Sequence, residues 1–198
     1  MHRTVLGGQV TSFERPWMVV VADVRVLDIR QGRRPGASDV AVRTLVSRGI
    51  PVVLASADPA TSVRPIQSIL GLDAPFISAG GAELHVPRGY FENVHGLGPR
   101  SADANVIAFG TRTGSPEFTR AIQLLLGLFW NHGDKGMVVG VSDRESTLLA
   151  AADIPILVRN PDIDQVPLRK SLPDAYYTSA TGSAGWAEGI LGPVETWP

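Results

Sequence analysis

Asp23, Ser56 and Asp143 each stand close behind a short apolar run of the kind that forms a buried β-strand; the runs cover residues 18–22, 51–55 and 137–141. Ligands of open α/β sheets bind outside the carboxyl ends of the strands, so these three side chains can converge on one site. Carboxylates and hydroxyls can serve as nucleophiles, proton carriers or metal ligands. A single Asp after a strand more often only caps or turns the chain. The expected convergence of three such side chains at one edge is what favours a functional site.

The elements that would position these residues alternate along the chain. Strands are expected near 17–23, 51–55, 75–78, 106–109, 137–142 and 154–158, and helices near 38–49, 59–71, 115–129, 148–152 and 183–191. Residues 1–16 are expected to form a loose lead-in, 82–104 a Gly- and Pro-rich stretch, and 159–174 a polar loop. Apolar strands alternating with amphipathic helices predict an α/β fold: a three-layer, doubly wound parallel sheet covered by helices on both faces.

Capping residues predict where the helices begin, and the spacing of apolar residues predicts which side of each helix faces the core. Ser38 is expected to cap the first helix, with Val42, Leu45 and Val46 on one face, and Asp58 to cap the second. In the closing helix, Trp186 and Ile190 are expected to face inward.

Composition narrows the class of protein. The 198 residues are 44% hydrophobic and 19% charged, which is typical of a single globular domain spanning 1–198. A net charge of −1 argues against a broad nucleic-acid surface. The absence of cysteine excludes disulfides and thiolate chemistry. No apolar run reaches membrane-span length and no early segment is typical of a signal peptide, so a cytoplasmic protein without a membrane partner is expected.

Histidine and lysine offer little further chemistry. The chain has only two lysines, which excludes most lysine-based mechanisms. Its four histidines show no metal-ligand spacing, and none pairs visibly with a serine and an acid, so packing or surface roles are expected. They are His2, His85, His95 and His132.

Several blocks of sequence resemble the haloacid-dehalogenase (HAD) superfamily, and within it the mannosyl-3-phosphoglycerate phosphatases and Cof-like sugar phosphatases. The blocks are RGIPVVLAS at 48–56, LGLDAPFI at 70–77, GGAEL at 80–84, PRGYF at 87–91, and VGVSD to DIPIL across 139–157. The resemblance covers roughly residues 17–91 and 117–191, and the block from Leu70 to Phe91 is its most specific part. It implies a HAD-like Rossmannoid core.

The resemblance also implies Mg²⁺-dependent hydrolysis of a phosphomonoester. Asp23 matches the nucleophile, which in this family is also a metal ligand, Ser56 matches the phosphate-binding hydroxyl, and Asp143 matches the first metal acid of the fourth motif. In such enzymes the nucleophile forms an aspartyl-phosphate and a second Asp two residues later transfers the proton.

Two motifs depart from the family pattern. Where the pattern DxDGT requires the acid/base Asp, this chain has Arg25, which stays protonated at physiological pH and places a fixed cation beside the metal position. In the fourth motif Asp143 is followed by Arg144, and Glu145 is only a weak substitute for the missing acids. Mg²⁺ binding is therefore expected to be weak or absent.

The phosphate-binding lysine of the family has two candidate replacements. If helix 117–129 is the third-motif helix, Phe118 stands at the lysine position and Arg120 is the nearest cation, which is the favoured placement. The alternative is Lys135 in HGDKG, which lacks a following helix and otherwise reads as a solvated turn lysine.

The chain also has too few residues between the middle block and the third motif for a large cap domain. Family members with the middle block insert a large cap before the third motif, whereas only residues 84–115 are available here. These residues are interpreted as a reduced remnant of the cap region, which leaves an essentially capless core.

These departures leave three hypotheses open. The favoured one is a non-catalytic or repurposed HAD-like protein that binds a phosphorylated or anionic small molecule or a protein partner. The others are an active Mg²⁺-dependent phosphomonoesterase and a structural subunit; a homodimer is plausible in each case. Arg25 is expected to pair with Asp23 or Asp143, to join Ser56 in holding an anion, or to turn out to solvent.

Overall fold

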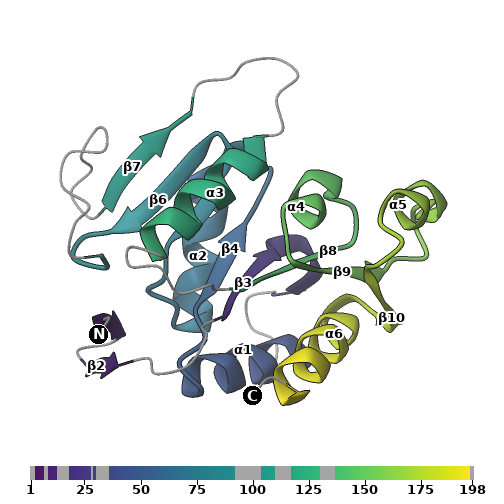
Figure 1. Ribbon diagram of the computed structural model, residues 1–198, viewed down its shortest axis with the longest axis horizontal. Helices are drawn as coiled ribbons and strands as arrows, with labels where there is room; N and C mark the ends of the chain where they lie inside the picture. The colour runs from purple at the N-terminus through teal and green to yellow at the C-terminus, as the bar shows by residue number, and fades with distance from the viewer. Residues whose placement is uncertain are drawn as a thin grey trace.

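A computed structural model of the protein describes residues 3–6, 9–12, 18–27, 29, 36–91, 104–109, 117–129 and 137–196 (Figure 1). The strands of its main sheet are β3 (Met18–Asp23), β4 (Val52–Ala55), β5 (Phe76–Ser78), β6 (Glu83–Pro87), β7 (Ala104–Ala108), β8 (Met137–Ser142), β9 (Ile154–Arg159) and β10 (Tyr176–Thr181). Within the described residues they form one eight-stranded sheet in the order β10-β9-β8-β3-β4-β5-β6-β7.

The middle of this sheet is parallel, as expected for a doubly wound fold. Strand β3 lies between β8 and β4 and runs parallel to both. Strands β5, β9 and β10 continue the parallel arrangement outward, and only β6 and β7 at one edge run antiparallel. The predicted α/β class and all six predicted strands are confirmed, and their bounds differ from the structure by no more than a few residues.

Helices cover both faces of the sheet and complete three layers (Figure 1). The helical elements are η1 (Val24–Leu27), α1 (Ala37–Ser47), α2 (Ala60–Leu70), η2 (Ala79–Gly81), α3 (Glu117–Phe129), α4 (Ser146–Ala150), α5 (Val166–Ser171) and α6 (Gly182–Thr196). Successive residues of a strand point to opposite faces, so Val20 packs with α1, α2 and α6, whereas Val19 and Val21 pack with α3 and α4.

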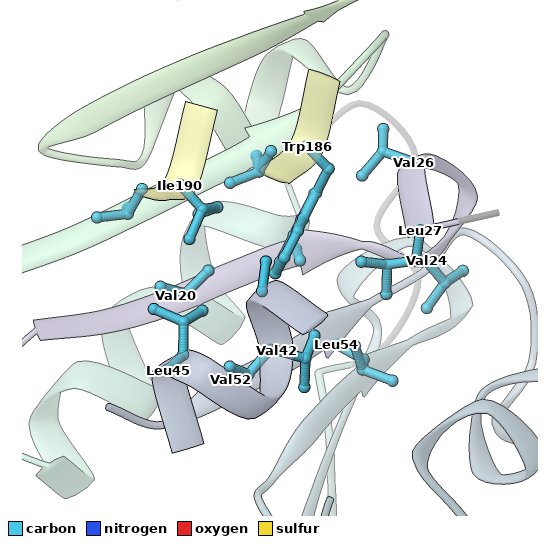
Figure 2. Packing of buried hydrophobic residues seen from close by; sticks show 14 of the residues in the cluster. Val20, Val24, Val26, Leu27, Val42, Leu45, Val52, Leu54, Trp186 and Ile190 are labelled. Carbon is cyan, nitrogen blue, oxygen red and sulfur yellow. The ribbon is translucent and has the colours of Figure 1, made fainter. Parts of the chain in front are cut away.

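Helix α6 closes the first of these cores. Figure 2 shows Trp186 and Ile190 facing Val20 of β3 and Val42 and Leu45 of α1. Trp186 and Ile190 are both 0% exposed, which confirms that the closing helix turns these residues inward. A fully buried tryptophan removes a large apolar area from water, so this contact contributes several kcal/mol to holding α6 on the sheet.

Other expectations about helix ends are wrong. Ser38 does not cap α1: the N-cap is Gly36, and the Ser38 hydroxyl instead donates to the Leu27 carbonyl at 2.6 Å. Val46 is 44% exposed, because the buried stripe of α1 runs through Ser38, Ala41, Val42 and Leu45. Asp58 does not cap α2 either, since Pro59 stands at its N-cap and no side chain bonds there.

Some elements lie where loops were expected. Strand β6 falls in the Gly- and Pro-rich stretch and α5 in the polar loop, while β10 was not predicted at all. Strands β1 (Arg3–Leu6) and β2 (Gln9–Ser12) pair antiparallel within the expected lead-in. The described parts of 84–115 include β6 and β7, which extend the core sheet; their interpretation as a cap remnant stays a prediction.

A close approach between β8 and α4 gives a direct test of this packing. A Cβ atom added at Gly140 would lie 2.6 Å from Ala152 Cβ and 3.2 Å from the Leu148 carbonyl, so Gly140→Ala should destabilise the protein by about 1–3 kcal/mol. Gly127, on the exposed side of α3, has nothing within 4 Å of such an atom, so Gly127→Ala should be stabilising by about 0.5–1 kcal/mol. Equilibrium denaturant unfolding measures both, and equal stability of the two variants would contradict this packing.

Candidate functional site

Three strand ends meet at the carboxyl edge of the sheet. Asp23 is the last residue of β3, and its Cα pairs in register with Ala55 of β4, directly before Ser56. On the other side, Val141 of β8 pairs with Ala22, so Ser142 and Asp143 follow at the same edge. The parallel register therefore brings the predicted strand-end residues to one edge, as the sequence indicated.

The Asp23 carboxylate is buried and closely surrounded by donors. Asp23 is 1% exposed. Its Oδ1 accepts from the Arg25 amide and from Arg25 Nε, both at 3.0 Å. Its Oδ2 accepts from Arg25 Nη2 at 2.7 Å, from Arg25 Nε at 3.1 Å and from the Ser142 hydroxyl at 2.9 Å. Both carboxylate oxygens are thus occupied by groups of the protein itself.

Arg25 reaches Asp23 because the chain bends directly after β3. The short 3₁₀ turn η1 buries Val24, Val26 and Leu27 and leaves Arg25 on its open side, with its side chain 30% exposed. Arg25 Nη2 also contacts Glu145 Oε1. The hydrogen bonds and negative charge of Asp23, together with Glu145, raise the pKa of Arg25, so this guanidinium stays charged.

Ser142 fixes the loop that carries Glu145. Its hydroxyl donates to Asp23 and accepts from the amides of Arg144 at 3.1 Å and Glu145 at 2.9 Å. Ser142 is 0% exposed, so this oxygen connects the ends of β3 and β8 inside the protein. The apolar run before Asp143 indicates a strand end, but nothing in the sequence singles out Ser142 as the connecting residue.

Asp143 pairs with its own neighbour rather than with Arg25. Arg144 Nε donates to Asp143 Oδ1 at 2.9 Å and Arg144 Nη2 to Oδ2 at 3.0 Å. Asn160 Nδ2 donates to Oδ2 at 2.6 Å, and Gln165 Nε2 donates to the Asp143 carbonyl at 2.7 Å. Burial alone would raise the pKa of Asp143, but the hydrogen bonds from Arg144 and Asn160 outweigh it and the pKa is lowered.

Ser56 lies at the right strand end but faces into its own turn. It is 1% exposed; its hydroxyl accepts from the Asp58 amide at 3.0 Å and lies 3.4 Å from Asp58 Oδ2. Its carbonyl accepts from the Gly80 amide at 3.0 Å. The structure gives no contact between Ser56 and Arg25, so the predicted phosphate-binding role of Ser56 stays a prediction.

No contact between residues that the structure describes brings either candidate for the missing lysine to this edge of the sheet. Arg120 is exposed on α3, and Phe118, at the lysine position of the favoured placement, is 3% exposed in the core. Lys135 lies outside the described residues. Their roles in phosphate binding stay predictions.

One histidine has partners that sequence reasoning missed. His85 Nε2 lies 3.0 Å from the Ser78 hydroxyl and 3.0 Å from Glu83 Oε2, and its ring stacks on Phe76 with centroids 4.3 Å apart. Ser78 is 0% exposed, so its hydroxyl has no access to a substrate. Burial lowers the pKa of His85 although Glu83 lies beside it. His85 does pair with a serine and an acid, which the sequence did not indicate. Its burial nevertheless agrees with the expected packing role.

The described carboxylates do not fit a resident Mg²⁺ as they are arranged. Magnesium requires near-octahedral oxygen ligands at about 2.0–2.1 Å, usually including one or two carboxylates. Both oxygens of Asp23 and both of Asp143 accept hydrogen bonds from guanidinium groups. Within the part of the chain that the structure describes, no group of three or more His, Cys, Asp and Glu side chains could hold a metal.

No described helix is both long and apolar enough to span a membrane. The comparison with models of protein families gives no match, and neither does the search of curated proteins.

Solved structures, in contrast, do resemble this chain. A protein of Thermoplasma acidophilum has a TM-score of 0.58 at 12% identity, with 91% of this chain and 99% of that one covered. A haloacid dehalogenase-like hydrolase from Bacteroides thetaiotaomicron gives 0.57 at 11% identity, covering 89% and 99%. The sucrose-phosphatase from Synechocystis, solved with sucrose and phosphate, gives 0.52 at 16% identity, covering 90% and 98%.

The similarity to these solved structures concerns the fold. The chain has the α/β fold of the HAD-like hydrolases, phosphatases among them. The fold implied by the sequence resemblance is therefore confirmed. Identities this low establish the fold and not the chemistry, because one fold hosts many functions.

The lowered pKa of Asp143 predicts an acid-dependent loss of stability. The ordinary pKa is 3.8, so the ionised carboxylate stabilises the folded protein fully above that value and loses its effect as the pH falls through the lower folded value. Asp143→Asn should lower the free energy of unfolding at pH 6 by about 1–3 kcal/mol and flatten its decline below pH ~4. Denaturant unfolding between pH ~2.5 and ~6 measures this; the exposed Asp174→Asn is the control, and an unchanged acid slope in Asp143→Asn would contradict it.

Proposed function

We propose that this protein is a HAD-like member of the phosphatase class whose active site no longer catalyses, and that it binds a phosphorylated or otherwise anionic ligand or a protein partner there. The single observation that carries the proposal is the Arg25–Asp23 pair. Arg25 makes four hydrogen bonds to the carboxylate that would have to attack phosphorus.

The pair removes two functions that the reaction requires. A carboxylate nucleophile needs an unencumbered oxygen aimed at the phosphoryl group, whereas both oxygens of Asp23 accept charge-assisted hydrogen bonds. The proton carrier of the family stands two residues further on, where Arg25 has no proton to exchange at physiological pH. Neither function has a replacement among the described contacts of this edge.

The charges exposed to solvent support binding of an anion. The side chains of Asp23 and Asp143 are 1% and 9% exposed, whereas those of Arg25 and Arg144 are 30% and 42% exposed. The carboxylates of Asp23 and Asp143 are therefore covered, and the guanidinium groups paired with them are the more exposed partners. Guanidinium groups favour phosphate and carboxylate oxygens because their donors match the spacing of two acceptor oxygens.

The test is an activity assay with a generic phosphomonoester in the presence of Mg²⁺. We expect no turnover above the rate without protein, and no difference between the wild type and Asp23→Asn, because the nucleophile is not available. Steady turnover that disappears in Asp23→Asn would instead establish an active sugar-phosphate type of phosphatase and overturn the proposal.

A second comparison separates a binding role from a purely structural one. Ligand binding and association state are measured for the wild type, Asp23→Asn and Arg25→Ala, by calorimetry and by light scattering after size exclusion. Binding of inorganic phosphate that weakens in Arg25→Ala supports the proposal. If neither variant changes binding or association, including any homodimer, the site is irrelevant and a structural subunit is the better interpretation.

A further inference from the structure

We infer that Arg25 and Arg144 form a metal-independent receptor for a phosphate-class dianion, with the Glu145 carboxylate as the internal counter-ion that this ligand displaces. The inference rests on the proposed function, since it concerns the same site. It adds the ligand class, the residues that bind the ligand and the absence of a metal requirement.

The two guanidinium groups are held in place by the same kind of contact. Arg25 uses Nε and Nη2 to bind Asp23, and Arg144 uses Nε and Nη2 to bind Asp143. Among the contacts between described residues, neither Nη1 atom has a partner. Each arginine is thus oriented by a buried carboxylate while one donor edge is left for a ligand.

The two groups also lie near one another. Ser142 links them: its hydroxyl accepts from the Arg144 amide and donates to Asp23, which holds Arg25 in the turn after β3. The positive charge of Arg25 also acts on Arg144, where it opposes the rise in the pKa of Arg144 that Asp143 causes. Two cations at one edge match a dianionic phosphate better than a single-charge carboxylate. The charge that Mg²⁺ supplies in a phosphatase would here be supplied by side chains of this chain.

Glu145 is the partly exposed carboxylate of this cluster. It is 24% exposed and contacts Arg25 Nη2, so its carboxylate sits where a phosphate oxygen would bind. The cluster contains three carboxylates and two guanidinium groups, an excess of one negative charge, which weakens binding of any anion. Displacing or neutralising Glu145 removes that excess, whereas Asp23 and Asp143 are buried and cannot leave.

The decisive experiment is calorimetric titration of inorganic phosphate, and separately of phenyl phosphate, into the wild type and Glu145→Gln, with EDTA present. We expect Glu145→Gln to bind about two- to fivefold more tightly than the wild type, because a partly exposed competing ion pair is removed. The probe that binds more tightly shows whether the site favours free phosphate or a phosphoryl group on a larger molecule.

Two controls separate displacement from a general change of charge. Asp39→Asn removes a carboxylate that pairs with Arg43 on α1 and should leave binding unchanged. Glu145→Asp keeps the charge but shortens the side chain by one methylene, so its affinity should lie between those of the wild type and Glu145→Gln. Equal affinity in the wild type and Glu145→Gln, or equal gains in Asp39→Asn and Glu145→Gln, would overturn the inference.

The roles of the two arginines and of Mg²⁺ are tested by the same calorimetric titration. Arg25→Gln and Arg144→Gln should each weaken phosphate binding by about tenfold or more, and thermal unfolding checks that the variants are folded. Mg²⁺ titrated into the wild type should give no heat of binding, and Arg25→Asp should recover some. Phosphate binding that requires Mg²⁺, or tight Mg²⁺ binding by the wild type, would overturn metal independence. Neither result would decide whether the protein catalyses, because the activity assay tests that separately.

Discussion

The ion pair between Asp23 and Arg25 is the contact on which the rest of this site depends. An unpaired carboxylate as buried as Asp23, at 1% exposure, would cost several kcal/mol of stability. Arg25 and Ser142 supply the missing donors, and Ser142 in turn orders the loop that carries Glu145. Removing one partner of such a pair costs far more stability than the pair contributes in net, so Arg25 and Ser142 are both needed to keep Asp23 buried.

The fold explains why these residues meet although they are far apart in the chain. Arg25 and Glu145 are separated by 120 residues and Asp23 and Ser142 by 119, yet β3 and β8 are adjacent parallel strands. Parallel strands end at one edge, so whatever follows β3 and β8 comes together there. The fold thus brings these residues to one edge of the sheet, although several of them differ from the HAD pattern that the sequence resembles.

Much of this arrangement could be predicted from sequence because it depends on local pattern. The apolar runs ending in Asp23 and Asp143 predicted both strands, and the pairing of Arg25 with Asp23 was one of the outcomes expected from their spacing of two residues. The partners of Arg25 and Asp143 across the chain, Glu145 and Asn160, could not be predicted, because they depend on how loops meet in space.

The errors have the same origin. Strand β6 was missed because residues 82–104 are rich in Gly and Pro, whereas its polar residues Glu83 and His85 find a partner in Ser78 on β5. Ser38 was read as a cap because serine is a common capping residue, but its hydroxyl satisfies the carbonyl of Leu27, at the end of η1. In both cases a tertiary hydrogen bond overrides a local propensity.

Replacing a bound dication by a tethered guanidinium changes what the site can do. Mg²⁺ can exchange, carries two charges and holds substrate oxygens and water in a defined geometry. Arg25 carries one charge, is planar, cannot dissociate and cannot activate water, but it needs no ion from solution and is already oriented by Asp23. Such a group can hold an oxyanion, whereas in-line attack on phosphorus still requires an available nucleophile and a proton carrier. Under the proposed function, the same arginine that makes a metal unnecessary also removes the means of catalysis, so the two properties are expected to occur together.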